Sequence, residues 1–139
     1  IIVGIGYDHA STGDSSRVRD YTPTSNPAFK QLTGGAAAYP DFIEGGVSDL
    51  IHIREGDALV TLASDLPDNV DLLLLDGAKT LYGDVLGLVE KHLRPGALVV
   101  ADNTDYCPEY LAHVRAPENG YVSVPFADDI ELSIRLSAC

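Results

Sequence analysis

One strand–helix–strand segment constrains the fold more than any other part of the sequence. It begins with a mostly apolar run at residues 70–75, interrupted only by Asp71, which is typical of a buried strand. Apolar residues then recur at helical spacing over residues 80–93, and residues 94–96, Arg-Pro-Gly, predict the end of that helix. A second apolar run follows at residues 97–101. Strand, helix and strand over about 30 residues predict a parallel βαβ unit with a right-handed crossover.

The flanking segments predict further strands of the same sheet. Residues 1–6 look like a strand that enters a glycine-containing turn, and residues 17–19 give a weaker strand signal. Residues 51–53 alternate as a short strand. Near the C-terminus, residues 121–124 and 130–136 alternate with period two, which predicts an antiparallel hairpin. We therefore expect an α/β fold with a mostly parallel sheet and a C-terminal antiparallel hairpin.

Length, charge and cysteine content exclude several classes of protein. The 139 residues, 45% of them hydrophobic, fit one domain over residues 1–139. The net charge of −12, with nine basic against 21 acidic residues, argues against nucleic-acid binding, which needs clustered Lys and Arg. No apolar run approaches the roughly 20 residues of a membrane span, and the start lacks the charged segment of a signal peptide. Cys107 and Cys139 lack metal-type spacing, so we expect free thiols in a cytoplasmic protein.

The residues that end the predicted strands are the first candidates for a binding site. Ligands of open α/β sheets bind beyond the carboxyl ends of the parallel strands. The strand ends carry Gly4 and Gly6 after the first strand, Gly56 and Asp57 after residue 53, Asp76 after residue 75, and Asp102 with Asn103 after residue 101. The glycines Gly4 and Gly6 would let the backbone approach a nucleotide closely.

Asp76 and Asp102 end the two strands that flank one crossover helix. Two close carboxylates repel each other, and Mg²⁺ or another hard divalent cation would remove that repulsion. Asn103 adds a neutral oxygen beside Asp102, and Lys79 at the start of the helix is a candidate general base. Ordinary polar turns and a solvated surface lysine account for the same residues, so that alternative stays open.

The combined order and spacing of three segments point to a family. The segments are Gly56-Asp57-Ala58-Leu59, Val70-Asp71-Leu72-Leu73-Leu74-Leu75-Asp76-Gly77-Ala78-Lys79 with Tyr82, and Leu93-Arg94-Pro95-Gly96-Ala97-Leu98-Val99-Val100-Ala101-Asp102-Asn103. Together they resemble the small catechol and caffeoyl-CoA O-methyltransferase-like family of class I S-adenosylmethionine-dependent methyltransferases. The resemblance covers residues 42–136.

This resemblance implies a Rossmann-like sheet of seven strands with the last one antiparallel. It also implies S-adenosylmethionine as cofactor and Mg²⁺ or another divalent cation as metal. The implied metal ligands are Asp76, Asp102 and Asn103, and the implied base toward the acceptor hydroxyl is Lys79. The implied cofactor positions are Gly4, Gly6, Asp20, Gly56, Asp57, Ala58 and Asp76, with Gly56 to Ala58 at the adenine. Tyr82 follows the family pattern as a packing residue.

The N-terminal third departs from the family pattern. Residues 3–12 resemble the first cofactor motif, but Gly4 stands where an acidic residue is usual and Ala10 where a second glycine is usual. Asp20 is the candidate for the acid that binds the ribose hydroxyls. The chain starts on a strand-like run, so we expect it to lack the family's N-terminal helices.

These features leave three functions open. The first is methyl transfer to a hydroxyl of a small, catechol-like acceptor with assistance from a divalent cation. The second is a catalytically silent, methyltransferase-like binding domain. The third is a nicotinamide-dependent oxidoreductase, although the third glycine of its fingerprint would fall at His9. Neither the acceptor nor the formation of a homodimer is fixed by the sequence.

Overall fold

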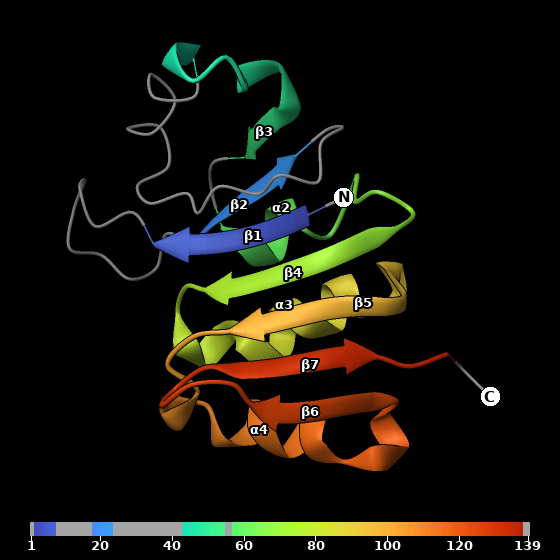
Figure 1. Cartoon of the computed structure of the whole chain (residues 1–139). Helices are drawn as coiled ribbons and strands as arrows, with labels where there is room; N and C mark the ends of the chain where they lie inside the picture. Colours follow the sequence, from blue (N-terminus) through green and yellow to red (C-terminus); the bar gives the residue numbers. More distant parts are fainter. Residues whose placement is uncertain (1, 8–17, 24–42, 55–56, 138–139) are drawn as a thin grey trace.

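Seven strands form a single sheet in the order β3-β2-β1-β4-β5-β7-β6 (Figure 1). The computed structural model describes residues 2–7, 18–23, 43–54 and 57–137. The strands are β1 (Ile2–Tyr7), β2 (Val18–Pro23), β3 (Ile51–Arg54), β4 (Val70–Asp76), β5 (Leu93–Ala101), β6 (Tyr121–Pro125) and β7 (Glu131–Arg135). The described part of the chain includes the α-helices α2 (Ala58–Thr61), α3 (Tyr82–Val89) and α4 (Pro108–Arg115). Short 3-10 turns lie at Ser48–Leu50, Lys79–Leu81, Glu90–His92, Thr104–Tyr106 and Pro117–Asn119.

The predicted βαβ unit is present as β4, α3 and β5. The strands β1, β4 and β5 pair in parallel at the centre of the sheet. The helical stretch predicted at residues 80–93 consists of α3 with a 3-10 turn at each end. The strand β5 starts at Leu93, four residues before the predicted start, because Leu93 already pairs with Val70 of β4, and the register then shifts before Leu98 pairs with Leu72. The prediction of a mostly parallel α/β sheet with a C-terminal hairpin is confirmed.

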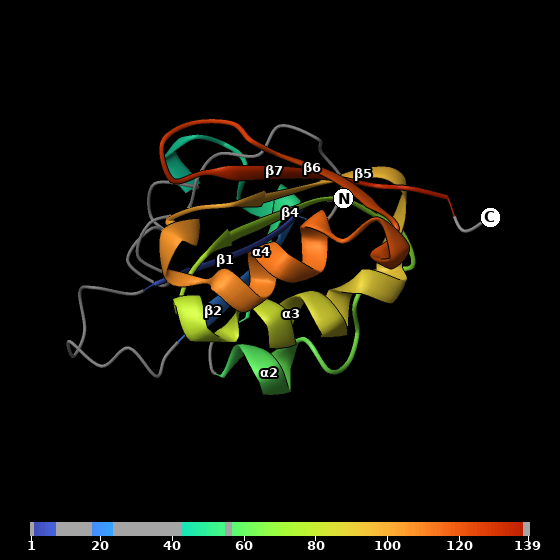
Figure 2. The same ribbon diagram turned by 90° about the horizontal axis from the view of Figure 1, so that it is seen from below.

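The helices α2, α3 and α4 cover one face of the sheet (Figure 2). Side chains of a strand alternate between the two faces, and in β4 the buried residues Leu73 and Leu75 lie on the helical side. The buried helical residues Tyr82, Val85 and Leu86 pack into the same core. Burying one such side chain contributes roughly 1.5–3 kcal/mol, so this packing fixes the position of α3 and of the strand ends beside it. Among the described helices, none is long and apolar enough to cross a membrane.

One strand runs against the direction that the family resemblance implies. The strand β2 pairs antiparallel with both β1 and β3, so it points the opposite way from β1, β3, β4, β5 and β6. Ten residues, 8–17, separate β1 from β2. A crossover to a parallel neighbour needs about a dozen residues or more, so a connection of this length favours the antiparallel pairing.

The C-terminal hairpin is anchored to α4 by a buried carboxylate. The side chain of Glu131 in β7 has no measurable exposure, and Arg115 donates from Nε and Nη2 to its two oxygens at 2.8 and 2.7 Å. Ser123 of β6 donates to the same carboxylate at 2.6 Å. The hydrogen bonds from Arg115 hold the pKa of Glu131 below its usual value, although burial opposes this shift. The ion pair therefore connects α4, β6 and β7.

Replacement of Arg115 by Ala should lower the free energy of unfolding by about 2 kcal/mol at pH 7, because it leaves a buried carboxylate without its charged partner. A carboxyl group whose pKa is lowered by folding stabilises the protein above its unfolded pKa of about 4.3, and this contribution disappears as the pH falls through the folded pKa. The difference between the two proteins should therefore shrink below about pH 4. Urea denaturation of both proteins at several pH values measures this difference in the free energy of unfolding.

Arg94→Ala is the matched control, since Arg94 binds Asp71 in a pair that is largely exposed on both sides. Such pairs contribute about 0–1 kcal/mol. Equal destabilisation by the two substitutions would show that the buried pair does not anchor the hairpin.

Candidate functional site

The strand order reverses between β1 and β4. From β1 the chain continues to β2 and β3 on one side, and it then crosses to β4 on the other side. Ligands of open α/β sheets bind at the carboxyl ends of strands where the order reverses in this way. In the parallel register, Gly6 of β1 lies opposite Asp76 at the end of β4.

Asp76 and Asp102 lie close together, as predicted. The backbone N–H of Asp102 donates to the carbonyl oxygen of Leu75 at 2.9 Å, which joins the ends of β4 and β5. Burial raises the pKa of Asp102, the Asp76 carboxylate raises it further, and Lys79 partly opposes both effects. The pair therefore favours the arrival of positive charge.

Lys79 and Tyr82 extend this cluster from the start of α3. The Lys79 Nζ atom lies 3.6 Å from Asp76 Oδ1 and donates to Tyr82 Oη at 2.8 Å. The hydroxyl of Tyr82 in turn lies 2.8 Å from the carbonyl oxygen of Leu75 and 3.0 Å from that of Asp102, so its proton is donated to these acceptors. Burial raises the pKa of Tyr82 far above its usual value, which keeps this proton in place. The sequence predicted only a packing role for Tyr82.

The β6–β7 loop supplies a residue that sequence reasoning missed. Asn103 has left-handed backbone angles, φ 52° and ψ 45°, and its Nδ2 atom donates to Asp129 Oδ2 at 2.8 Å. Thr104 donates to the carbonyl oxygen of Asp129 from its backbone nitrogen at 2.8 Å and from Oγ1 at 3.0 Å. Adjacent acidic residues ahead of β7 were the only sequence signal for this contact.

The remaining predicted residues are dispersed. Gly4 and Gly6 lie within β1 rather than in the turn after it. Asp57 caps α2 by accepting the N–H of Leu59 at 2.9 Å, and Ala58 is fully buried. In the register Asp20 is paired with Ile5 and Arg54 inside β2. Gly56 and His9 lie outside the described residues. The cofactor roles of all these positions stay predictions.

The predicted metal ligands at the rim all offer oxygen atoms. Within the residues that the structure describes, no three His, Cys, Asp or Glu side chains are grouped to hold a metal ion. The predicted set contains two carboxylates, Asp76 and Asp102, together with the amide of Asn103. Oxygen ligands of this kind suit Mg²⁺, which usually keeps several waters. The Asp76 carboxylate lies close enough to raise the pKa of Asp102, so two acidic groups of this set are neighbours.

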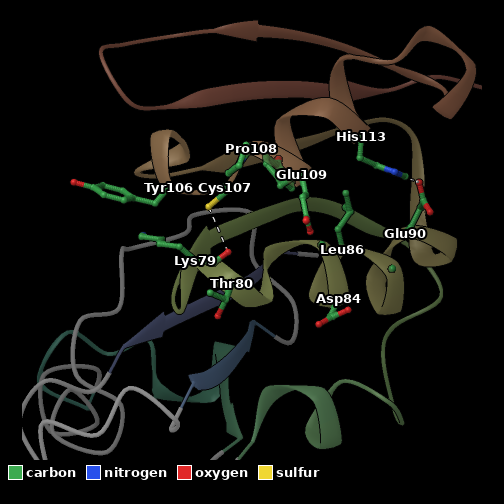
Figure 3. A pocket seen from close by; sticks show the side chains of 13 residues that line it. Lys79, Thr80, Asp84, Leu86, Glu90, Tyr106, Cys107, Pro108, Glu109 and His113 are labelled. Atoms are coloured by element: carbon green, nitrogen blue, oxygen red, sulfur yellow. Dashed lines mark hydrogen bonds and ion pairs between the residues drawn. The ribbon is translucent and has the colours of Figure 1, made fainter.

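A pocket of about 510 Å³ lies on the helical side of this cluster, between α3 and α4 (Figure 3). Cys107 at one end donates from Sγ to the carbonyl oxygen of Lys79 at 3.3 Å, and its thiol is free, as predicted. At the other end His113 Nε2 lies 3.7 Å from Glu90 Oε1. Lys79 is thus shared between this pocket and the rim.

Two solved structures have a similar fold. One is a Klebsiella pneumoniae protein assigned as an O-methyltransferase, with 22% identity and a TM-score of 0.65 over 80% of this chain and 64% of that chain. The other is a methyltransferase from Geobacter sulfurreducens, with 24% identity and a TM-score of 0.61 over 74% of this chain and 53% of that chain. The chain therefore shares the fold of these two methyltransferases, and it spans less than two thirds of the length of either protein. No protein-family model and no curated protein matches the sequence.

Tyr82→Phe should lower the free energy of unfolding by about 1 kcal/mol, since it removes the hydroxyl that joins the strand ends to Lys79. Thermal or urea denaturation measures the change. Tyr106→Phe is the control, because Tyr106 is 75% exposed and surface changes stay within about 0.5 kcal/mol. No difference between the two variants would mean that the Tyr82 hydroxyl does not stabilise the rim.

Proposed function

We propose that this chain transfers a methyl group from S-adenosylmethionine to a hydroxyl of a small, catechol-like acceptor, assisted by Mg²⁺ or another divalent cation. The observation that carries the proposal is the clustering of Lys79, Asp76 and Asp102 at the rim, beside the point where the strand order reverses. The O-methyltransferase assignment of the Klebsiella protein with the same fold supports this reaction type. The net charge of −12 favours a small-molecule acceptor over a nucleic acid.

The chain's own residues account for binding and orientation. The cofactor would bind at the carboxyl ends of β1 and β4, where Gly6 lies opposite Asp76. Asp76, Asp102 and Asn103 would hold the cation. A cation bound there would supply positive charge that lowers the pKa of the acceptor hydroxyl and orients its oxygen.

Lys79 would take the proton of the acceptor hydroxyl. Its amine is held by Tyr82 at 2.8 Å and stays beside Asp76. In its unprotonated form the amine accepts the hydroxyl proton as the acceptor oxygen bonds to the methyl carbon. The bond between that carbon and sulfur breaks at the same time, and its electron pair stays on sulfur, giving S-adenosylhomocysteine. The protein contributes chiefly by aligning oxygen, carbon and sulfur.

One observation favours the second candidate, a silent binding domain. The strand β2 is reversed relative to β1, so its carboxyl end lies at the edge of the sheet away from Asp76 and Asp102. Asp20, the ribose-binding acid proposed for this strand, lies inside β2 opposite Ile5 of β1 and not at the carboxyl end of β2. A chain that binds S-adenosylhomocysteine but transfers no methyl group would fit this second candidate.

Asp102→Ala should reduce Mg²⁺-dependent methyl transfer to catechol by about 100-fold or more, because it removes a carboxylate from the cation site. Transfer from methyl-labelled S-adenosylmethionine measures the rate. Asp105→Ala is the matched control, since Asp105 is exposed on the same loop and makes the same change in charge. Unchanged metal-dependent transfer in the Asp102 variant would show that the cation assignment is wrong.

A further inference from the structure

Asp129 contacts the candidate cation site without being one of its predicted ligands. It lies in the β6–β7 loop, 26 residues after Asn103 in the sequence, and its Oδ2 atom accepts a hydrogen bond from Asn103 Nδ2 at 2.8 Å. The two side chains are partly buried. This contact connects the antiparallel hairpin to the turn after β5.

The contact decides which way the Asn103 amide faces. An amide presents an NH₂ group on one side and an oxygen on the other, whereas an ionised carboxylate can only accept hydrogen bonds. The Asp129 carboxylate must therefore meet the NH₂ group. The oxygen of Asn103, the atom that a hard cation requires, is left free of this bond.

The backbone of the same loop is held separately. Thr104 is buried, and it donates from both its backbone nitrogen and Oγ1 to the carbonyl oxygen of Asp129. These two bonds do not involve the Asp129 side chain. Truncation of the carboxylate therefore leaves the loop attached to the turn, removes the bond that orients Asn103, and also removes a negative charge that acts on Asp102.

We infer that Asp129 is a positioning residue that orients the Asn103 amide oxygen for the divalent cation. The inference rests on the proposed function, since it assigns a role in the cation site proposed above. Partners of this kind fix the orientation of metal ligands, and their loss typically weakens metal binding by 10–100-fold.

The affinity of the full chain for Mn²⁺ tests this role without an activity assay. It can be measured by calorimetry or from the electron paramagnetic resonance signal of free Mn²⁺. Asp129→Ala should weaken Mn²⁺ affinity by about tenfold, while its melting temperature in EDTA stays within a few degrees of the original. Asp129→Asn keeps an acceptor oxygen, so it should lose no more than about threefold. Asp128→Asn makes the same change in charge at an exposed neighbour and should have no effect.

A double-mutant cycle separates positioning from charge. In an Asn103→Ala background, Asp129→Ala should cause no further loss of affinity, because the residue through which Asp129 acts is gone. A persistent tenfold loss there, or an equal loss in Asp129→Asn and Asp129→Ala, would overturn the positioning role. If the unaltered chain binds no Mn²⁺, both the positioning role and the cation site of the proposed function are wrong. If the unaltered chain binds Mn²⁺ and Asp129→Ala binds it equally well, only the positioning role is wrong.

Discussion

The hydroxyl of Tyr82 lies between the carbonyl oxygens at the ends of β4 and β5, at 2.8 Å from Leu75 and 3.0 Å from Asp102. It also accepts a hydrogen bond from Lys79. The ring of Tyr82 is buried against Tyr110 in an edge-on contact with centroids 5.8 Å apart, so the packing of α3 and α4 fixes the hydroxyl. The core between helices and sheet therefore determines where the charged groups of the rim are placed. Asp76, Lys79 and Asp102 are held by the same contacts that stabilise the fold.

The direction of β2 sets a second constraint on function. Ten residues separate β1 from β2, and these two strands pair antiparallel. On its other side, β1 pairs in parallel with β4. The half of the sheet that carries Asp76, Asp102 and Lys79 keeps the arrangement implied by the family resemblance. The other half, which includes Asp20, does not. The positions of the candidate catalytic groups therefore agree with the family resemblance, whereas the position of the candidate ribose-binding residue does not.

Local sequence patterns predicted the elements that are stabilised by regular burial. Apolar runs predicted β4 and β5, and the alternation of apolar and polar residues predicted the β6–β7 hairpin. Strands that are buried on one or both faces produce such regular patterns. The helix α4 was not predicted, since it buries only Tyr110 and Val114 on its inner face and gives a weak apolar period. The direction of β2 could not be read from residues 17–19 alone, because strand periodicity carries no information about pairing direction.

The residues of the candidate site also divide into those that the sequence predicted and those that it did not. Asp76, Asp102 and Asn103 were found because they lie at the ends of recognisable strands, and Lys79 was found because it lies at the start of the helix after Asp76. The contribution of Asp129 was not found, because its contact with Asn103 joins residues 26 positions apart and depends on how the hairpin returns to the rim. The role of Tyr82 as a hydrogen-bond donor was also missed, since an apolar helical face predicts burial but not the destination of a hydroxyl group.

The central claim is that the rim between β1 and β4 binds the cofactor and that the neighbouring carboxylates bind a cation. Calorimetric titration of S-adenosylhomocysteine into the chain, with and without Mg²⁺, tests this claim most directly. The account predicts binding in the micromolar range, followed by binding of a catechol only when Mg²⁺ is present. The absence of S-adenosylhomocysteine binding under both conditions would contradict it.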